Sequence, residues 1–303
     1  MKKPIKNLKK KIRESSMVSS RRPSAKAKEI IETLQIRYPS EISIRDIAME
    51  RGAYVRERVL EGSEGRLVRK GARGIITVNK WIAEEGRKRF AIAHELGHFE
   101  LHTNSQLILC TEEDMYVWNE TEEQELEANE FAANILMPEE IFKCYLKNEA
   151  PNMETVKELA QEFRTTLTAT ALRYVNISQE PCAVVVCKNG YIKWYKKSGS
   201  FNHHVRVKEK LSPNTYAFYF YEDGDLPMRP ETVPAAAWLA GDVDEDAWII
   251  EHAIALRSYG VVLSLLWINE EIRSRYRRYD YDEGEPEYDL TNPFTPDGKR
   301  WRW

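Results

Sequence analysis

The stretch at residues 84–101 restricts the fold of this chain more than any other part of the sequence. Two apolar stripes run along it at helical spacing: Ile92, Leu96 and Phe99 on one side, and Phe90, Ala93, Gly97 and Leu101 on another. Between the stripes stand His94, Glu95 and His98, in the pattern H-E-x-x-H. A helix buried on both flanks would leave these polar groups without partners. We therefore expect a buried helix whose polar residues bind a ligand.

The spacing of the two histidines indicates a metal ion as that ligand. On a helix, His94 and His98 are one turn apart and point the same way. Two imidazoles so placed can bind one Zn²⁺ at about 2.0–2.1 Å. Glu95 lies beside them, where a carboxylate can take a proton from a metal-bound water. The competing interpretation, a helix with two surface histidines, disagrees with the buried flanks.

The residues leave the third metal ligand open. No further histidine follows at the spacing of a three-histidine site, but residues 121–136 predict a helix rich in glutamate: Glu122, Glu123, Glu125, Glu127 and Glu130. Glu125 lies on one edge of the buried stripe of this helix and Glu127 on the other, so spacing alone does not choose between them. His102, one turn after His98, is a candidate support for a ligand. It could also be an alternative ligand, but it is more typical of a histidine near the negative end of the helix dipole.

Composition excludes several classes of protein. The 303 residues carry a net charge of -3, which argues against a globally basic nucleic-acid binder but not against a local basic patch. No apolar run is long enough to span a bilayer, and the basic N-terminus has no apolar segment typical of a secretory signal. The four cysteines form no C-x-x-C pair and favour free thiols. We expect a cytoplasmic protein without a membrane contact.

The order of helix-like and strand-like segments predicts an α+β protein with two domains and two extended ends. We expect a basic disordered arm over residues 1–24 and a mainly helical domain over residues 25–177. Three strand-like segments near residues 53–79, separated by glycine-containing breaks, predict a small antiparallel sheet within that domain. The helices over residues 152–163 and 165–175 resemble a helix-turn-helix, although packing within the domain is the simpler interpretation.

The second domain is expected to be smaller and rich in strands, over residues 178–275. Asn189-Gly190 between two apolar segments is a strong hairpin signal. Further apolar runs follow, some of which could equally be helical. Residues 276–303 are acidic and aromatic and are expected to form an extended tail.

Two blocks of sequence resemble the ImmA/IrrE metallopeptidases. The blocks are FAIAHELGHFELH and ELEANEFAANILMP, and the resemblance covers about residues 26–176. It implies a zincin-like peptidase domain, with His94, His98 and Glu125 as the metal ligands. Glu125 corresponds to the first glutamate of the second block, which is why we prefer it to Glu127. The implied cofactor is Zn²⁺, with Mn²⁺ as an alternative.

The resemblance also implies a reaction and a substrate class. We expect hydrolysis of a peptide bond, with Glu95 as the general base. Tyr116 is a weak candidate for the group that stabilises the oxyanion, because its segment lies between the two blocks. The implied protein substrate is a helix-turn-helix transcriptional repressor, cleaved in a stress or mobile-element response. The alternatives are a non-catalytic metal-binding regulator and a DNA-binding regulator, so an interaction with nucleic acid stays open.

Overall fold

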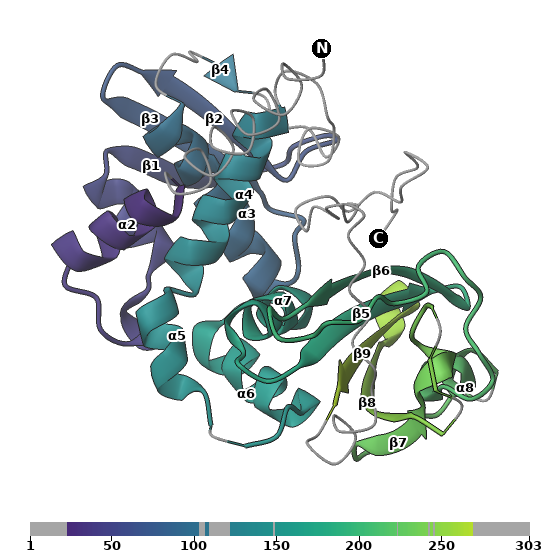
Figure 1. Ribbon diagram of the computed structural model, residues 1–303. Helices are drawn as coiled ribbons and strands as arrows, with labels where there is room; N and C mark the ends of the chain where they lie inside the picture. The colour runs from purple at the N-terminus through teal and green to yellow at the C-terminus, as the bar shows by residue number, and fades with distance from the viewer. Residues whose placement is uncertain are drawn as a thin grey trace, which may run out of the picture. The chain divides into compact units, whose positions relative to one another are not determined.

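The computed structural model describes residues 23–102, 107–108, 122–147, 149–222, 224–241, 243–244 and 246–268. The chain divides into two compact units, Met1–Tyr145 with Gln161–Thr166, and Leu146–Ala160 with Leu167–Trp303. Each unit combines helices with one sheet, which confirms the predicted α+β class (Figure 1). The predicted domain boundary after residue 177 stays a prediction. The expected N-terminal arm, apart from residues 23 and 24, and the expected C-terminal tail lie outside the described residues.

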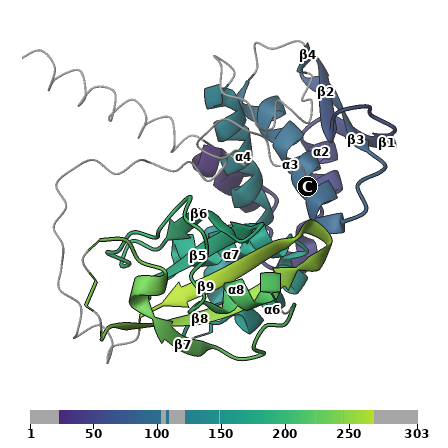
Figure 2. The same ribbon diagram turned by 90° about the vertical axis from the view of Figure 1, so that its right-hand side faces the viewer.

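The first unit holds a helix over residues 23–33 and a series of labelled elements. These are α2 (Ile44–Glu50), β1 (Ala53–Arg58), β2 (Gly65–Lys70), β3 (Arg73–Asn79), α3 (Glu85–Leu101), β4 (Leu107–Ile108), α4 (Glu122–Leu136) and α5 (Glu139–Tyr145), with a short 3-10 turn at Pro39–Glu41. The helices α3 and α4 lie side by side, and α3 also packs against β1, β2 and β3 (Figures 1 and 2). The predicted helix at residues 84–101 therefore lies at the centre of this unit.

The sheet of the first unit is mixed, which corrects the prediction of an antiparallel sheet. Its order is β1-β3-β2-β4, in which β1 and β3 are parallel while the β2–β3 and β2–β4 pairs are antiparallel. A tight turn at Gly71 joins β2 to β3 as a hairpin, and β1 pairs with the far side of that hairpin. Sequence signals for turns report only on neighbouring strands, so they do not reveal which strand β1 joins.

The second unit is built on an antiparallel five-stranded sheet of order β6-β5-β9-β8-β7 (Figure 2). Its elements are α6 (Met153–Phe163, whose last turn belongs to the first unit), α7 (Leu167–Ile177), β5 (Cys182–Lys188), β6 (Tyr191–Lys197), α8 (Tyr216–Glu222), β7 (Glu231–Pro234), β8 (Trp248–Leu256) and β9 (Val261–Trp267). Helix α7 packs against β5 and β6, and α8 against β8 and β9. The hairpin predicted at Asn189-Gly190 joins β5 to β6, and both turn residues have positive φ.

Candidate metal centre

Helix α3 carries the H-E-x-x-H residues in the interior of the first unit. His94, Glu95 and His98 are buried, with exposed fractions of 1% or less. Gly97 lets α4 approach closely, because a Cβ there would lie 3.0 Å from the Cα of Ala128. The close approach brings the start of α4 against the polar side of α3.

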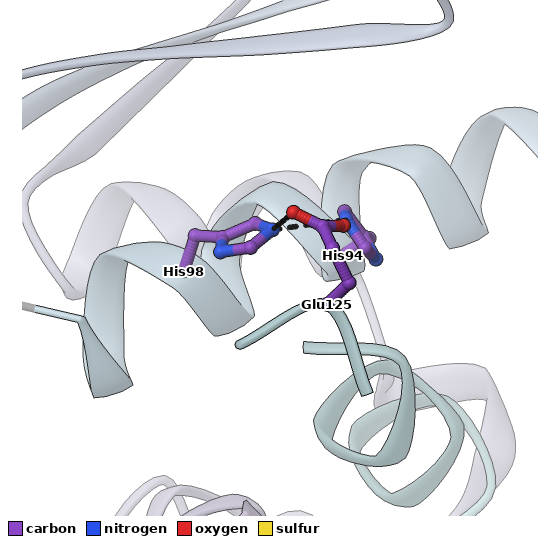
Figure 3. A group of neighbouring side chains, drawn as sticks. All are labelled: His94, His98 and Glu125. Atoms are coloured by element: carbon purple, nitrogen blue, oxygen red, sulfur yellow. Dashed lines mark hydrogen bonds and ion pairs between the residues drawn. The ribbon is translucent and has the colours of Figure 1, made fainter. Parts of the chain in front are cut away.

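Glu125 of α4 meets both histidines of α3. Its Oε2 lies 3.0 Å from Nε2 of His94 and its Oε1 lies 3.1 Å from Nε2 of His98. The two Nε2 atoms are themselves 3.0 Å apart. Figure 3 shows the carboxylate of Glu125 pointing toward both imidazole rings. His94 and His98, one turn apart on α3, and Glu125 of α4 thus converge on one point.

The spacing of these three side chains fits a small divalent cation. Ligands at about 2.0–2.1 Å from a tetrahedral zinc lie about 3.3 Å from one another. The distances of 3.0–3.1 Å between the side chains come close to that value. Two imidazoles and one carboxylate are also a donor set found in catalytic zinc sites, which keep the fourth position open.

Asn129 of α4 fixes the tautomer of His94. Nδ1 of His94 lies 2.9 Å from Oδ1 of Asn129. An amide oxygen only accepts hydrogen bonds, so Nδ1 must carry the proton and Nε2 presents its lone pair. Asn129 is not among the site residues that the sequence motifs indicate. Its position four residues after Glu125, on the same face of α4, is the signal that could have found it.

His98 is held in the same tautomer by a longer chain of contacts. Its Nδ1 lies 2.9 Å from Nδ1 of His102, whose Nε2 lies 2.9 Å from Oε2 of Glu127. The carboxylate accepts the proton of His102 Nε2, which leaves His102 Nδ1 to accept from Nδ1 of His98. Nε2 of His98 then presents a lone pair as well. Glu127, the competing third ligand, contacts His102 instead.

These assignments gather three electron-pair donors around one point. The Nε2 atoms of His94 and His98 and the carboxylate of Glu125 repel one another unless a cation, either a proton or a metal ion, lies between them. Burial is the largest single influence on the pKa of His94 and lowers it, but the hydrogen bond and charge of Glu125, with smaller contributions from Glu95 and Asn129, together outweigh burial and raise that pKa. Burial lowers the pKa of His98 to about 4. The three residues therefore fit a metal ion. A proton can take the place of that ion between the donor atoms.

The carboxylate of Glu125 is suited to remain charged. Burial is the largest single influence on its pKa and raises it, but the hydrogen-bonding and charge interactions with His94 and His98 together outweigh burial and lower the pKa to about 2. An ionised carboxylate adds the negative charge that favours a divalent cation at this position. Since the three residues are buried, that attraction is only weakly screened by solvent.

Glu95 lies on the side of α3 that faces the sheet. A Cβ on Gly65, the first residue of β2, would lie 2.5 Å from Oε1 of Glu95. Only a glycine leaves room for this carboxylate beside the strand. Tyr116, the candidate oxyanion group, lies outside the described residues.

Comparison with known proteins gives a family for this part of the chain. Residues 48–174 match the family model Peptidase_M78, described as the IrrE N-terminal-like domain. This stretch of the chain is therefore similar to the IrrE N-terminal-like family. The IrrE N-terminal-like domain includes all of α3 and α4, and with them His94, His98 and Glu125. The resemblance to the ImmA/IrrE metallopeptidases is thus confirmed.

A solved structure of a Mycobacterium tuberculosis transcriptional regulator is similar at 15% identity, with a TM-score of 0.47 over 81% of this chain and 76% of that chain. Among curated proteins, none matches.

The family supports a metallopeptidase-type function, and a peptidase acts on a protein substrate. The cluster of His94, His98 and Glu125 is compatible with that function. Among the described residues, every helix is too short or too polar to cross a membrane.

Proposed function

We propose that this protein is a zinc-dependent endopeptidase whose metal is held by His94, His98 and Glu125. The observation that carries the proposal is the convergence of three lone-pair donors at 3.0–3.1 Å in a buried site. The match to a peptidase family supports hydrolysis as the reaction. Mn²⁺ is an alternative cofactor, because imidazole and carboxylate ligands also bind it.

Each residue of the site has a definite task in this proposal. A bound divalent ion polarises the scissile carbonyl and lowers the pKa of a water toward ~7. Glu95 takes the proton of the attacking water and passes it to the leaving amine. Asn129 holds the imidazole of His94 in position, and His102 does the same for His98. Tyr116 stays a candidate for the group that stabilises the oxyanion.

The proposed substrate is a helix-turn-helix transcriptional repressor. This finer assignment rests on the resemblance of residues 90–102 and 125–138 to the ImmA/IrrE metallopeptidases. Cleavage of such a repressor in the cytoplasm would release genes of a stress or mobile-element response.

The decisive test separates metal binding from cleavage. Glu95→Gln keeps the shape of the side chain and removes the basic oxygen. We expect zinc content near that of the wild type, while cleavage of a repressor encoded beside this gene falls by about 10²–10⁴-fold, the usual size of a general acid–base contribution. Zinc stoichiometry and cleavage rate are measured on the same samples.

Two outcomes would contradict the proposal. Normal cleavage by the Glu95→Gln variant would exclude Glu95 as the general base. Intact zinc binding by wild type, with no cleavage of any repressor tested, would favour the non-catalytic metal-binding regulator. The same experiment with Glu123→Gln, an exposed glutamate of α4, serves as the matched control and should leave both zinc content and cleavage unchanged.

A further inference from the structure

The sheet of the first unit has an outward face that the metal centre does not use. Helix α3 covers the other face, where Phe99 lies against Gly74 and under the guanidinium of Arg69. Pairing in register places ten residues of β1, β2 and β3 on the outward face: Tyr54, Arg56, Arg58, Arg66, Val68, Lys70, Arg73, Ile75, Thr77 and Asn79. We call this set the outward sheet face.

The charge of the outward sheet face is entirely positive. Five of its ten residues are basic, namely Arg56, Arg58, Arg66, Lys70 and Arg73, and none is acidic. Glu64, the acidic residue just before β2, is buried and paired with Arg87. In a chain of net charge -3, such a face is a local concentration of positive charge that attracts an anionic partner.

A row of apolar side chains crosses the middle of this face. Tyr54 pairs with Ile75, and Ile75 pairs with Val68, so the three stand side by side on neighbouring strands. Their exposed fractions are 62%, 37% and 39%. Lys70 and Arg73 form the next row on one side, and Arg66 and Arg56 the next row on the other.

The dimensions of the row match one side of a helix. Neighbouring strands lie about 4.8 Å apart, so the row is about 10 Å long. Apolar residues at i, i+4 and i+7 of a helix lie over a similar length, at about 1.5 Å per residue. The basic rows lie about 6.6 Å to either side, which is two residues along a strand. Acidic residues that flank the apolar stripe of such a helix would meet them.

We propose that the outward sheet face binds an acidic amphipathic helix of a partner protein. A nucleic acid fits less well, because its bases stack on aromatic rings and two of the three residues in the row are aliphatic. An acidic amphipathic helix matches both the apolar row and the basic rows of this face. The binding does not depend on the metal or on peptidase chemistry, since His94 and Glu95 lie on the covered side of the sheet.

The test uses a fluorescent peptide and the full-length protein. The peptide has about 18 residues of Leu, Ala and Glu, with Leu at i, i+4 and i+7 and Glu beside this stripe, as in an amphipathic helix. We expect saturable binding by fluorescence anisotropy that weakens as salt rises from about 50 to about 300 mM. A peptide of the same composition, with Leu scattered around the helix, should bind at least about tenfold more weakly.

Substitutions on the protein locate the binding surface. Lys70→Glu with Arg73→Glu, and separately Val68→Ser with Ile75→Ser, should each weaken binding about tenfold or more. Lys208→Glu with Lys210→Glu makes the same charge change on exposed lysines of the second unit and should leave binding unchanged. Zinc content, measured in parallel, reports whether the first unit is still folded. If the charge-reversed variant loses zinc, Lys70→Gln with Arg73→Gln replaces it.

Three results would overturn the proposal. The first is equal binding of the peptide by wild type and by both outward-face variants. The second is tighter binding of a single-stranded or duplex oligonucleotide than of the peptide, which would assign the face to nucleic acid. The third is binding only after the acidic residues at 280–289 are changed to amides in the full-length chain, which would assign the face to the chain's own tail.

Discussion

The carboxylate of Glu127 is linked to the candidate metal site through His102. The contacts from Glu127 to His102 and on to His98 are each 2.9 Å long. Such a contact behind a metal ligand holds the ring in one tautomer and one orientation, and thereby strengthens metal binding. The amide of Asn129 holds the ring of His94 in the same way.

We expect Glu127→Ala to weaken zinc binding by about 10–100-fold, because His98 loses its fixed orientation. Competition with a chelator of known affinity measures the change. Glu123→Ala, the same substitution at an exposed site of α4, gains the same helix propensity and should bind zinc as wild type does. Equal affinities of the two variants would refute the role of Glu127.

Acidification should release the metal through His94. Its pKa is raised while that of His98 is lowered to about 4, so His94 is the imidazole that takes up a proton as pH falls. Metal and proton compete for the same Nε2. The apparent zinc affinity should be constant above the pKa of His94 and fall roughly tenfold per pH unit below it. Chelator competition between about pH 8 and about pH 5.5 tests this, and a constant affinity throughout would contradict it.

Among the elements, the pairing of α3 with α4 decides the geometry of the site. Each helix supplies part of the ligand set, and Gly97 sets the distance between them. A Cβ at residue 97 would lie 3.0 Å from Cα and 3.1 Å from the carbonyl oxygen of Ala128. These are backbone atoms, which cannot rotate away as a flexible side chain could.

Gly97→Ala tests this contact because two effects oppose each other. Alanine in a helix is favoured over glycine by about 1 kcal/mol. Forcing α4 outward should destabilise the fold by about 1–3 kcal/mol and loosen zinc binding. We expect a net loss of both, measured by denaturant unfolding and by zinc affinity. Gly199→Ala, where a Cβ meets open space, is the control. A Gly97→Ala protein more stable than wild type would contradict the close packing.

On the scale of the whole molecule, the second unit has its own polar centre. The carboxylate of Glu251 in β8 is buried and accepts hydrogen bonds from the backbone N–H groups of Tyr216 and Ala217, from Trp238 and from Ser264. These hydrogen bonds join α8, the loop before β8 and β9 to one strand. The ligands of the candidate metal site all lie in the first unit.

Glu251→Ala should therefore destabilise the second unit alone. Three buried donors and the partly buried N–H of Tyr216 lose their acceptor, and each buried unsatisfied group costs about 1–3 kcal/mol. We expect an earlier unfolding transition, followed by tryptophan fluorescence, with normal zinc content in the folded protein. Loss of zinc within that same early transition would show that the two units unfold together.

Much of the site could be predicted from local patterns. The period of α3 placed His94 and His98 on one side of a buried helix, and helices were predicted close to the observed α4 and α6. Other features could not be predicted from local patterns. The short helix α5 has no long period to detect, and the apolar run at residues 216–222 fits a helix as well as a strand.

The sequence by itself determined which residues share a helical face, because that depends only on 3.6 residues per turn. Spacing left Glu125 and Glu127 as equals, since both border the buried stripe of α4, and only the family resemblance favoured Glu125. The contacts themselves, Glu125 with the two imidazoles and Glu127 with His102, were decided by the tertiary structure. The physical reason is that the rotation of α4 against α3 follows from packing at Gly97 and Ala128, a contact between segments 31 residues apart in sequence. The same holds for the outward sheet face, whose apolar row exists only once β1 pairs with β3.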